Sequence, residues 1–165
     1  MNKSTREVMH SSDRQDWRTP KAFFESLNAI YKFDLDGAAR SDNALCADFV
    51  SPASDALTYI PSRPRTIWLN PPYGRGITDR FARQAQVWCE KGSTVVMLLP
   101  ARTDTKMWHE VIERGVEEGW ATYKFVKGRL HFDDGKDPAP FPSVVVVFSN
   151  SEPMQYALHN FWRQP

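Results

Sequence analysis

The stretch Thr66-Ile67-Trp68-Leu69-Asn70-Pro71-Pro72-Tyr73-Gly74 joins a short apolar run to a polar turn. Residues 66–69 predict a strand, because β-branched and aromatic residues suit the pleated surface of a sheet. Asn70 follows that run directly. Pro71 and Pro72 stiffen the backbone, since a proline ring fixes φ and restricts the residue before it to extended geometry. The stretch therefore predicts a strand that ends in a held carboxamide, with the aromatic ring of Tyr73 beside it.

This combination suits chemistry on an aromatic amine. The exocyclic amine of adenine is a poor nucleophile because its lone pair is delocalised into the ring, and two fixed hydrogen-bond acceptors would draw that pair out of conjugation. The side-chain oxygen of Asn70 and the carbonyl of Pro71 are the candidate acceptors. Tyr73 offers a flat face, and stacking worth about 1–3 kcal/mol per base would offset part of the cost of extracting a base from a duplex. The alternative is an ordinary strand-ending turn, because Asn, Pro and Gly all favour turns.

Length and composition bound the class of protein. The chain has 165 residues with 41% hydrophobic content, which fits one compact domain. We expect residues 16–165 to form that domain, without a separate target-recognition domain, after a flexible polar leader over residues 1–15. The 21 basic and 20 acidic residues nearly balance, so affinity for nucleic acid requires a local patch.

The cysteines and the apolar runs indicate the cellular compartment of the protein. The sequence has two cysteines, Cys46 and Cys89, and neither has a partner at metal-ligand spacing. Its apolar stretches are far shorter than a membrane span. We therefore expect a cytoplasmic protein with no disulfide, no metal site and no membrane segment.

Two stretches near the start of the chain are candidate binding sites. Thr19 and Pro20 predict a helix start, with Thr19 as N-cap and Pro20 in the first turn, and a helix N-terminus also attracts anions. Asp36, Gly37 and Ala38 end a predicted strand over residues 32–36. At the carboxyl end of such a strand, small residues let a ligand approach and a carboxylate can hold an ammonium or a ribose hydroxyl. Asp36 could instead be a plain turn residue.

Helical and strand patterns alternate after the central turn. Helical patterns cover residues 79–92, 108–119 and 152–162, and strand patterns cover residues 94–99, 121–127 and 143–148. Residues 94–99 are apolar throughout, as in a strand buried on both faces. This order predicts an α/β fold with a mostly parallel sheet, right-handed crossovers and a terminal antiparallel hairpin.

Basic residues flank the central turn and could contact nucleic acid. The candidates near it in sequence are Arg63, Arg65, Arg75, Arg80 and Arg83. Such a cluster is typical of a site that holds phosphates around an extruded nucleotide, although it could also be a set of scattered solvated charges. Residues 128–132, which precede a long loop over residues 133–142, add two more candidates: Arg129 for a phosphate, and Phe132 for the second face of a base sandwich. The alternative for Phe132 is a place in the core, because an aromatic residue in a strand is more often part of the core.

Five stretches in order carry a resemblance to a known family. They are residues 17–20 (WRTP), 34–39 (DLDGAA), 68–73 (WLNPPY), 98–102 (LLPAR) and 128–132 (GRLHF). With them the chain resembles the small phage and prophage family of DNA N-6-adenine methyltransferases, and its Asn-Pro-Pro-Tyr resembles motif IV of S-adenosylmethionine-dependent amino-methyltransferases. The resemblance implies a class I, Rossmann-like methyltransferase fold of reduced size. It implies methyl transfer from S-adenosylmethionine to N6 of a flipped adenine in double-stranded DNA.

The resemblance also implies roles for individual residues. Thr19 and Pro20 would meet the carboxylate of the cofactor, with Asp34 and Asp36 in the same site. Asp48 and Asp55 would lie near the ribose and the adenine of the cofactor, in a region, residues 40–64, that reads as loops with two short or irregular strands. The catalytic motif would be Asn70-Pro71-Pro72-Tyr73, acting by direct displacement without a covalent enzyme intermediate.

Other functions fit the same residues. An enzyme of this fold could methylate an RNA base or a protein glutamine, and the cluster of arginines favours nucleic acid over protein. A non-catalytic DNA-binding or decoy protein could also keep the fold. The intact Asn-Pro-Pro-Tyr argues against such decay, because folding alone does not require that combination at a strand end.

Overall fold

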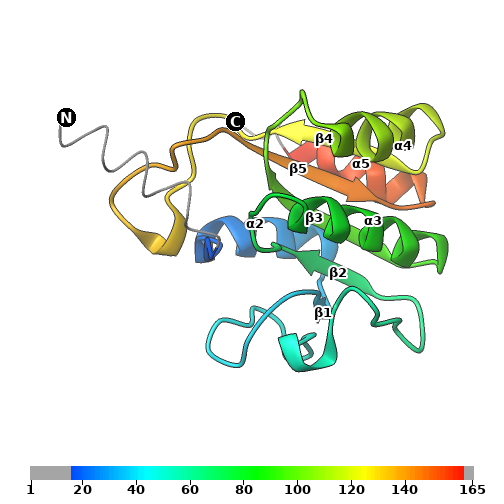
Figure 1. Ribbon diagram of the computed structural model, residues 1–165, viewed down its shortest axis with the longest axis horizontal. Coiled ribbons are helices and arrows are strands. Elements are labelled where there is room, and N and C mark those ends of the chain that lie inside the picture. Colours follow the sequence, from blue (N-terminus) through cyan, green and yellow to red (C-terminus); the bar gives the residue numbers. More distant parts are fainter. Residues whose placement is uncertain (1–15, 162–165) are drawn as a thin grey trace.

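A computed structural model describes residues 16–161 of the chain (Figure 1). The predicted flexible leader, residues 1–15, lies outside this part. Within it, five strands form one sheet: β1 (Leu35–Asp36), β2 (Thr66–Leu69), β3 (Thr94–Pro100), β4 (Ala121–Phe125) and β5 (Ser143–Phe148). Their order is β1-β2-β3-β5-β4.

Strand β5 is the antiparallel member of a mixed sheet. The first three strands pair in parallel, whereas β5 runs antiparallel to both β3 and β4. All six residues of β5 are buried, while four of the five residues of β4 are partly or fully exposed. Strand β5, which is apolar after Ser143, therefore takes an interior position, and the half-polar β4 forms the edge. The predicted Rossmann-like α/β fold is confirmed, with its antiparallel pair at one side of the sheet.

Helices cover both faces of the sheet. One face carries α3 (Ile77–Glu90) and a helical segment, Trp108–Glu113, that continues into α4 (Arg114–Glu117). The other face carries α2 (Lys21–Tyr31) and α5 (Glu152–Phe161). Figure 1 shows these layers on the two sides of the strands.

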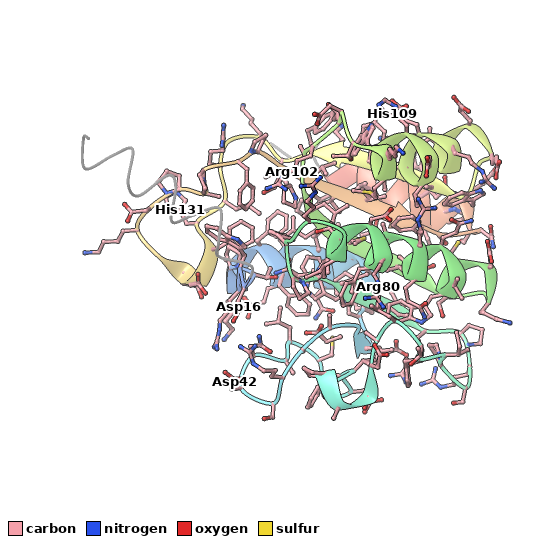
Figure 2. The ribbon with its side chains drawn as sticks, viewed as in Figure 1. Asp16, Asp42, Arg80, Arg102, His109 and His131 are labelled. Atoms are coloured by element: carbon pink, nitrogen blue, oxygen red, sulfur yellow. The ribbon has the colours of Figure 1, made fainter. Side chains whose placement is uncertain are left out.

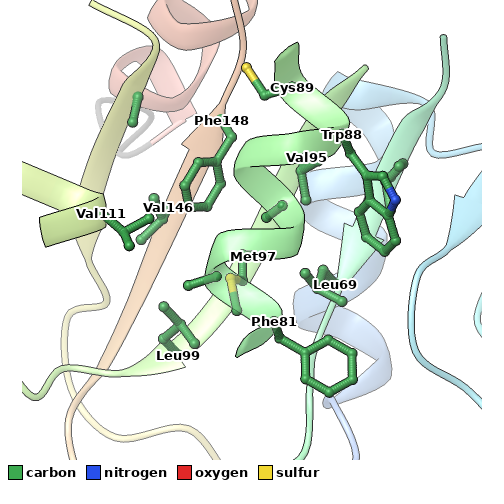
Figure 3. Close-up of a cluster of buried hydrophobic side chains, with 14 of the residues drawn as sticks. Leu69, Phe81, Trp88, Cys89, Val95, Met97, Leu99, Val111, Val146 and Phe148 are labelled. Atoms are coloured by element: carbon green, nitrogen blue, oxygen red, sulfur yellow. The ribbon is translucent and has the colours of Figure 1, made fainter. Parts of the chain in front are cut away.

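The core on the α3 face is built from alternate residues of the strands. Phe81 and Trp88 of α3 are buried against a strand layer that includes Leu69, Val95 and Met97 (Figure 3). The residues between these on the strands, such as Trp68, face α2 instead. This alternation is the period of two expected of strands, and it makes the central strands apolar on both faces.

Some local predictions need correction. Thr19 is not the N-cap of α2: the helix begins at Lys21, Pro20 takes the cap position, and no cap residue makes a side-chain bond. Helix α3 begins at Ile77, earlier than predicted, after Gly76 at a positive φ of 76°. Between residues 40 and 64, the two predicted strands reduce to a single bridge between Phe49 and Asp36.

Two negative findings concern the described part of the chain. Its helices include none that is long and apolar enough to cross a membrane. Across residues 16–161, no three His, Cys, Asp or Glu side chains gather as metal ligands would.

Candidate active site

A cleft of about 1310 Å³ opens where β1 and β2 end. Ligand pockets commonly measure about 300–1,000 Å³, so this cleft has room for a nucleoside-sized cofactor and part of a second substrate. It lies between the segment over residues 16–19, one face of α2 and the loops over residues 38–57. The predicted site residues that line it are Thr19, Asp36, Ala38, Asp55, Asn70, Pro71 and Pro72.

Asn70 is held from both ends of its carboxamide. Its Nδ2 donates to the main-chain oxygen of Trp17 at 2.6 Å and to Oγ1 of Thr19 at 2.9 Å. Its Oδ1 accepts a hydrogen bond from the hydroxyl of Tyr73 at 2.7 Å. Asn70 directly follows β2, so the strand carries the carboxamide to the cleft wall. The side chain therefore has one orientation, set by partners more than fifty positions away in the sequence as well as by its neighbour.

Tyr73 lies under the cleft wall and does not line the cleft. Its side chain is buried, and burial raises the pKa of its hydroxyl well above the usual value, so the hydroxyl remains a donor. The ring meets Phe132 and Phe141 edge to face, at centroid distances of 6.2 and 5.7 Å. In this structure, the flat face that we expected for a base is occupied by protein.

Phe132 is likewise part of the core. It is 4% exposed and packs against Trp17 at 5.5 Å as well as against Tyr73. The loop that carries it turns back onto the start of α2, where the amide of Asp133 donates to the carbonyl of Arg18. Phe132 is therefore a core aromatic residue in this structure, which is the alternative stated from the sequence.

Asp36 ends β1 as a buried carboxylate at the cleft. Its two oxygens accept hydrogen bonds from the amides of Ala38 at 3.3 Å and Leu45 at 3.0 Å. Burial raises the pKa of this carboxyl, and the two amide bonds oppose that rise. Asp36 therefore holds the loop that forms the far wall of the cleft, a turn-forming role that leaves lone pairs for a ligand.

Gly37 faces the core. A Cβ placed there would meet Ile67 and Trp88 at 3.0 Å and Leu69 at 3.2 Å. A glycine is therefore needed for packing against the core on the α3 face of the sheet, whereas the following Ala38 lines the cleft. Pro20, in the cap position of α2, does not line it.

Two of the predicted cofactor acids lie away from the cleft, beside two of the predicted DNA arginines. Arg65 pairs with Asp34 at 2.9 Å and with Asp48 at 2.8 Å, and Arg63 approaches Asp34 at 3.5 Å. Arg65 directly precedes β2, and Asp34 precedes β1, so this network caps the amino ends of the strands. From Arg65 to Asn70 an extended chain covers about 17 Å, so the two groups lie at opposite ends of the strand.

The remaining predicted arginines differ in their partners. Arg83 is neutralised by Asp79 at 3.1 Å and Glu110 at 2.7 Å. Arg75, Arg80 and Arg129 are exposed, and among the described residues none of them makes an ion pair with a carboxylate. Arg129 donates to the carbonyl of Ala139 at 3.4 Å.

Two ion pairs join opposite sides of the cleft, and no local sequence pattern predicts them. Arg18 pairs with Asp42 at 2.7 Å, and Arg40 pairs with Asp16 at 2.9 Å. Asp16 and Asp42 lie at the same end of the molecule as His131 (Figure 2). Because each pair joins residues 24 positions apart, only the folded chain reveals it.

Comparison with known proteins adds independent findings. The model of a family described as DNA N-6-adenine-methyltransferase (Dam) matches residues 6–155. The chain is 34% identical over 108 residues to a DNA N-6-adenine-methyltransferase of Escherichia phage T1, covering 65% of this chain and 44% of that protein. It is 31% identical over 116 residues to a DNA N-6-adenine-methyltransferase of Haemophilus phage HP1, covering 69% and 65%. The matched part is thus less than two thirds of either relative. A solved protein of Thermoplasma acidophilum overlays with a TM-score of 0.37 at 10% identity, over 68% of this chain and 50% of its own.

Proposed function

The chain belongs to the DNA N-6-adenine-methyltransferase (Dam) family, and from this we propose that it methylates N6 of an adenine flipped out of double-stranded DNA, with S-adenosylmethionine as the methyl donor. One observation carries the proposal: the held carboxamide of Asn70 lies on the wall of a cleft at the carboxyl ends of β1 and β2. Ligands of open α/β sheets bind at this end of the strands.

Asn70 and Pro71 would activate the amine. The Oδ1 atom of Asn70 has two lone pairs, and the hydroxyl of Tyr73 uses one of them. A hydrogen of the adenine amine can therefore bind the second, while the Pro71 carbonyl accepts the other amine hydrogen. Two such acceptors localise the nitrogen lone pair for attack, and the alkylated amine then releases a proton to solvent. Most of the rate would come from this positioning.

The cleft fits the donor that this reaction needs. Bound S-adenosylmethionine would supply the methyl group as a sulfonium electrophile. Thr19 and Asp36, with Ala38 and Asp55, line the cleft and are the residues that we propose hold it, with Asp36 as the partner of the ammonium group or a ribose hydroxyl. We leave Asp34 and Asp48 out of this set because both pair with Arg65 at the other end of the strands.

A covalent route through cysteine is disfavoured by the state of the thiols. Burial raises the pKa of Cys46 to about 12 and that of Cys89 to about 11, so both remain protonated at neutral pH. Because the thiolate is the nucleophilic form, neither thiol is activated. This supports direct transfer to the amine.

Phosphate contacts would come from arginines that have no acidic partner within residues 16–161. Arg75 lies in the turn after the Asn-Pro-Pro-Tyr motif, and Arg129 lies in the loop after β4. Strands β2 and β4 run in the same direction, so both arginines lie at the edge of the sheet where the cleft opens, and Arg80 lies at the end of the first turn of α3. A guanidinium that is free of carboxylates can bind a phosphate without first breaking an ion pair.

The test is a nucleoside mass analysis. Unmethylated duplex DNA is incubated with S-adenosylmethionine and either the wild type or Asn70→Ala. The DNA is then digested, and its nucleosides are identified by mass spectrometry. We expect N6-methyladenine from the wild type and almost none from the variant. Methylated cytosine would contradict the proposal. Methyl label found only on RNA or on glutamine of added protein would replace it with one of the rival functions, and no donor binding would favour a non-catalytic DNA-binding protein.

A further inference from the structure

The two hydrogens of the Asn70 amide nitrogen both point at the segment before α2. One binds the carbonyl of Trp17 at 2.6 Å and the other binds Oγ1 of Thr19 at 2.9 Å. A main-chain carbonyl can only accept hydrogen bonds, so the nitrogen end must face Trp17. A flipped carboxamide would place Oδ1 against that carbonyl with no hydrogen between them. The segment therefore decides which end of the amide is left to act as acceptor.

The Oδ1 atom of Asn70 accepts one hydrogen bond and keeps a second lone pair for another donor. The hydroxyl of Tyr73 is the donor to Oδ1 at 2.7 Å, and it can turn to the carbonyl of Leu98 at 3.2 Å as its alternative acceptor. Since the hydroxyl carries one hydrogen, it steadies Oδ1 with a single bond. Orientation thus comes mainly from the nitrogen end, where two bonds are made.

The segment itself is anchored from behind, so it can act as a fixed reference. The amide of Lys21 donates to Oδ1 of Asp134 at 3.2 Å, and the amide of Asp133 donates to the carbonyl of Arg18 at 2.9 Å. The ring of Trp17 packs against Phe132 at 5.5 Å. These contacts hold the residues on both sides of Thr19 without involving Asn70.

Thr19 lies between the cleft and the carboxamide of Asn70. It is 9% exposed, it lines the cleft, and its Oγ1 is an acceptor for Asn70. While Oγ1 accepts from Asn70, its own hydroxyl hydrogen remains to be donated elsewhere. We propose that Thr19 is a positioning residue for Asn70: it fixes the carboxamide so that Oδ1 faces the amine to be methylated. The inference rests on the proposed function for its catalytic consequence, but its structural part can be measured without any turnover.

The structural part is tested on the Asn70 side-chain amide by NMR. Its two NH resonances are identified by their loss in Asn70→Ala. We compare Thr19→Val, which keeps the shape of the side chain and removes the acceptor, with Thr19→Ser, which keeps the hydroxyl. We expect one resonance to shift and to exchange faster with water in Thr19→Val, and both to stay as in the wild type in Thr19→Ser.

The catalytic part is tested by single-turnover methyl transfer at saturating donor. We expect a rate about tenfold lower in Thr19→Val, as for the loss of one orienting hydrogen bond, and a rate within about twofold of the wild type in Thr19→Ser. Unchanged amide resonances in Thr19→Val would overturn the inference. A Thr19→Val variant that only weakens donor binding, with the saturated rate intact, would also overturn it and leave Thr19 as a donor contact. If the wild type transfers no methyl to DNA, the proposed function fails while the NMR comparison still decides how Asn70 is oriented.

Discussion

The two ends of strands β1 and β2 carry similar residues in different chemical states. At the carboxyl ends, Asp36 and Asn70 bond to backbone groups and to neutral side chains, and they line the cleft. At the amino ends, Asp34 and Asp48 bond to Arg65, whose side chain is only 11% exposed. Asp34 and Asp36 are two positions apart, yet one is neutralised and the other has no arginine partner among the described residues.

This difference separates the end of the strands that we propose binds ligands from an end held by ion pairs. Carboxylates that pair with a largely covered guanidinium stabilise the fold and are less available to a ligand. A carboxylate and a carboxamide held by backbone amides and hydroxyls keep lone pairs for a substrate. Position along the strand therefore matters more than residue type.

The largest effect is expected at the carboxyl end, from Asn70→Ala. Loss of the Oδ1 acceptor should lower the rate of methyl transfer at least about a hundredfold, as for other groups that act mainly in the transition state. Calorimetry should show donor affinity within a few-fold of the wild type, because the remaining cleft residues are intact. Near-normal turnover in this variant would remove Asn70 from the reaction.

The amino end should respond in stability and not in turnover. Arg65→Met leaves Asp34 and Asp48 without their shared partner, and we expect the free energy of unfolding to fall by about 2 kcal/mol in urea denaturation. Arg63→Met is the matched control, because Arg63 is 65% exposed and its one ion pair among the described residues is long, at 3.5 Å, so a change below about 0.5 kcal/mol is expected. If Arg65→Met instead abolished methyl transfer in the folded protein, the amino end would belong to the active site.

A smaller effect is expected from single arginines outside both networks. Arg75→Ala should weaken DNA binding a few-fold and reduce the slope of log affinity against log salt by about one, as for the loss of one phosphate contact. Arg83→Ala is the control, because Asp79 and Glu110 already neutralise that guanidinium. Fluorescence anisotropy on a labelled duplex at several salt concentrations measures both. Equal salt slopes for Arg75→Ala and the wild type would remove Arg75 from the interface.

The smallest effect concerns the pH dependence contributed by Asp36. Burial raises the pKa of its carboxyl above the ordinary value of 3.8, so the folded protein holds this proton more tightly than the unfolded chain. The contribution of Asp36 to stability therefore falls as pH rises from the ordinary value through the raised one, and is constant above it. Asp36→Asn cannot titrate, so its unfolding free energy should decline less over that window. A steeper decline in the variant would mean that the folded protein favours the ionised carboxylate.

The parts predicted well from the sequence depend on local patterns. The runs that became β3 and β5 are apolar after their first residues, Thr94 and Ser143, and Asn70 follows an apolar strand, so both strands and the central turn could be placed. Arg63 and Arg65 were grouped with Asn70 because they are near it in sequence, but the intervening strand carries them to opposite ends.

The rest depended on contacts between distant residues. Thr19 has the sequence of an N-cap, but its hydroxyl bonds to Asn70, which is 51 positions away. Tyr73 and Phe132 were expected to face a base, but they face each other because the loop after β4 folds back onto the start of α2. No periodicity in the sequence reports such a return of the chain.

An NMR titration can show at which end of β1 and β2 the methyl donor binds. S-adenosylhomocysteine, the demethylated product, is titrated into isotope-labelled protein, and the movement of each backbone amide resonance is followed. We expect the amide resonances of Ala38 and Leu45 and the side-chain amide resonances of Asn70 to move, while the amide resonances of Asp48 and Arg65 stay in place. Shifts that gather around Asp48 and Arg65 and leave Ala38 and Asn70 unmoved would contradict it, and would transfer the site to the other end of the strands.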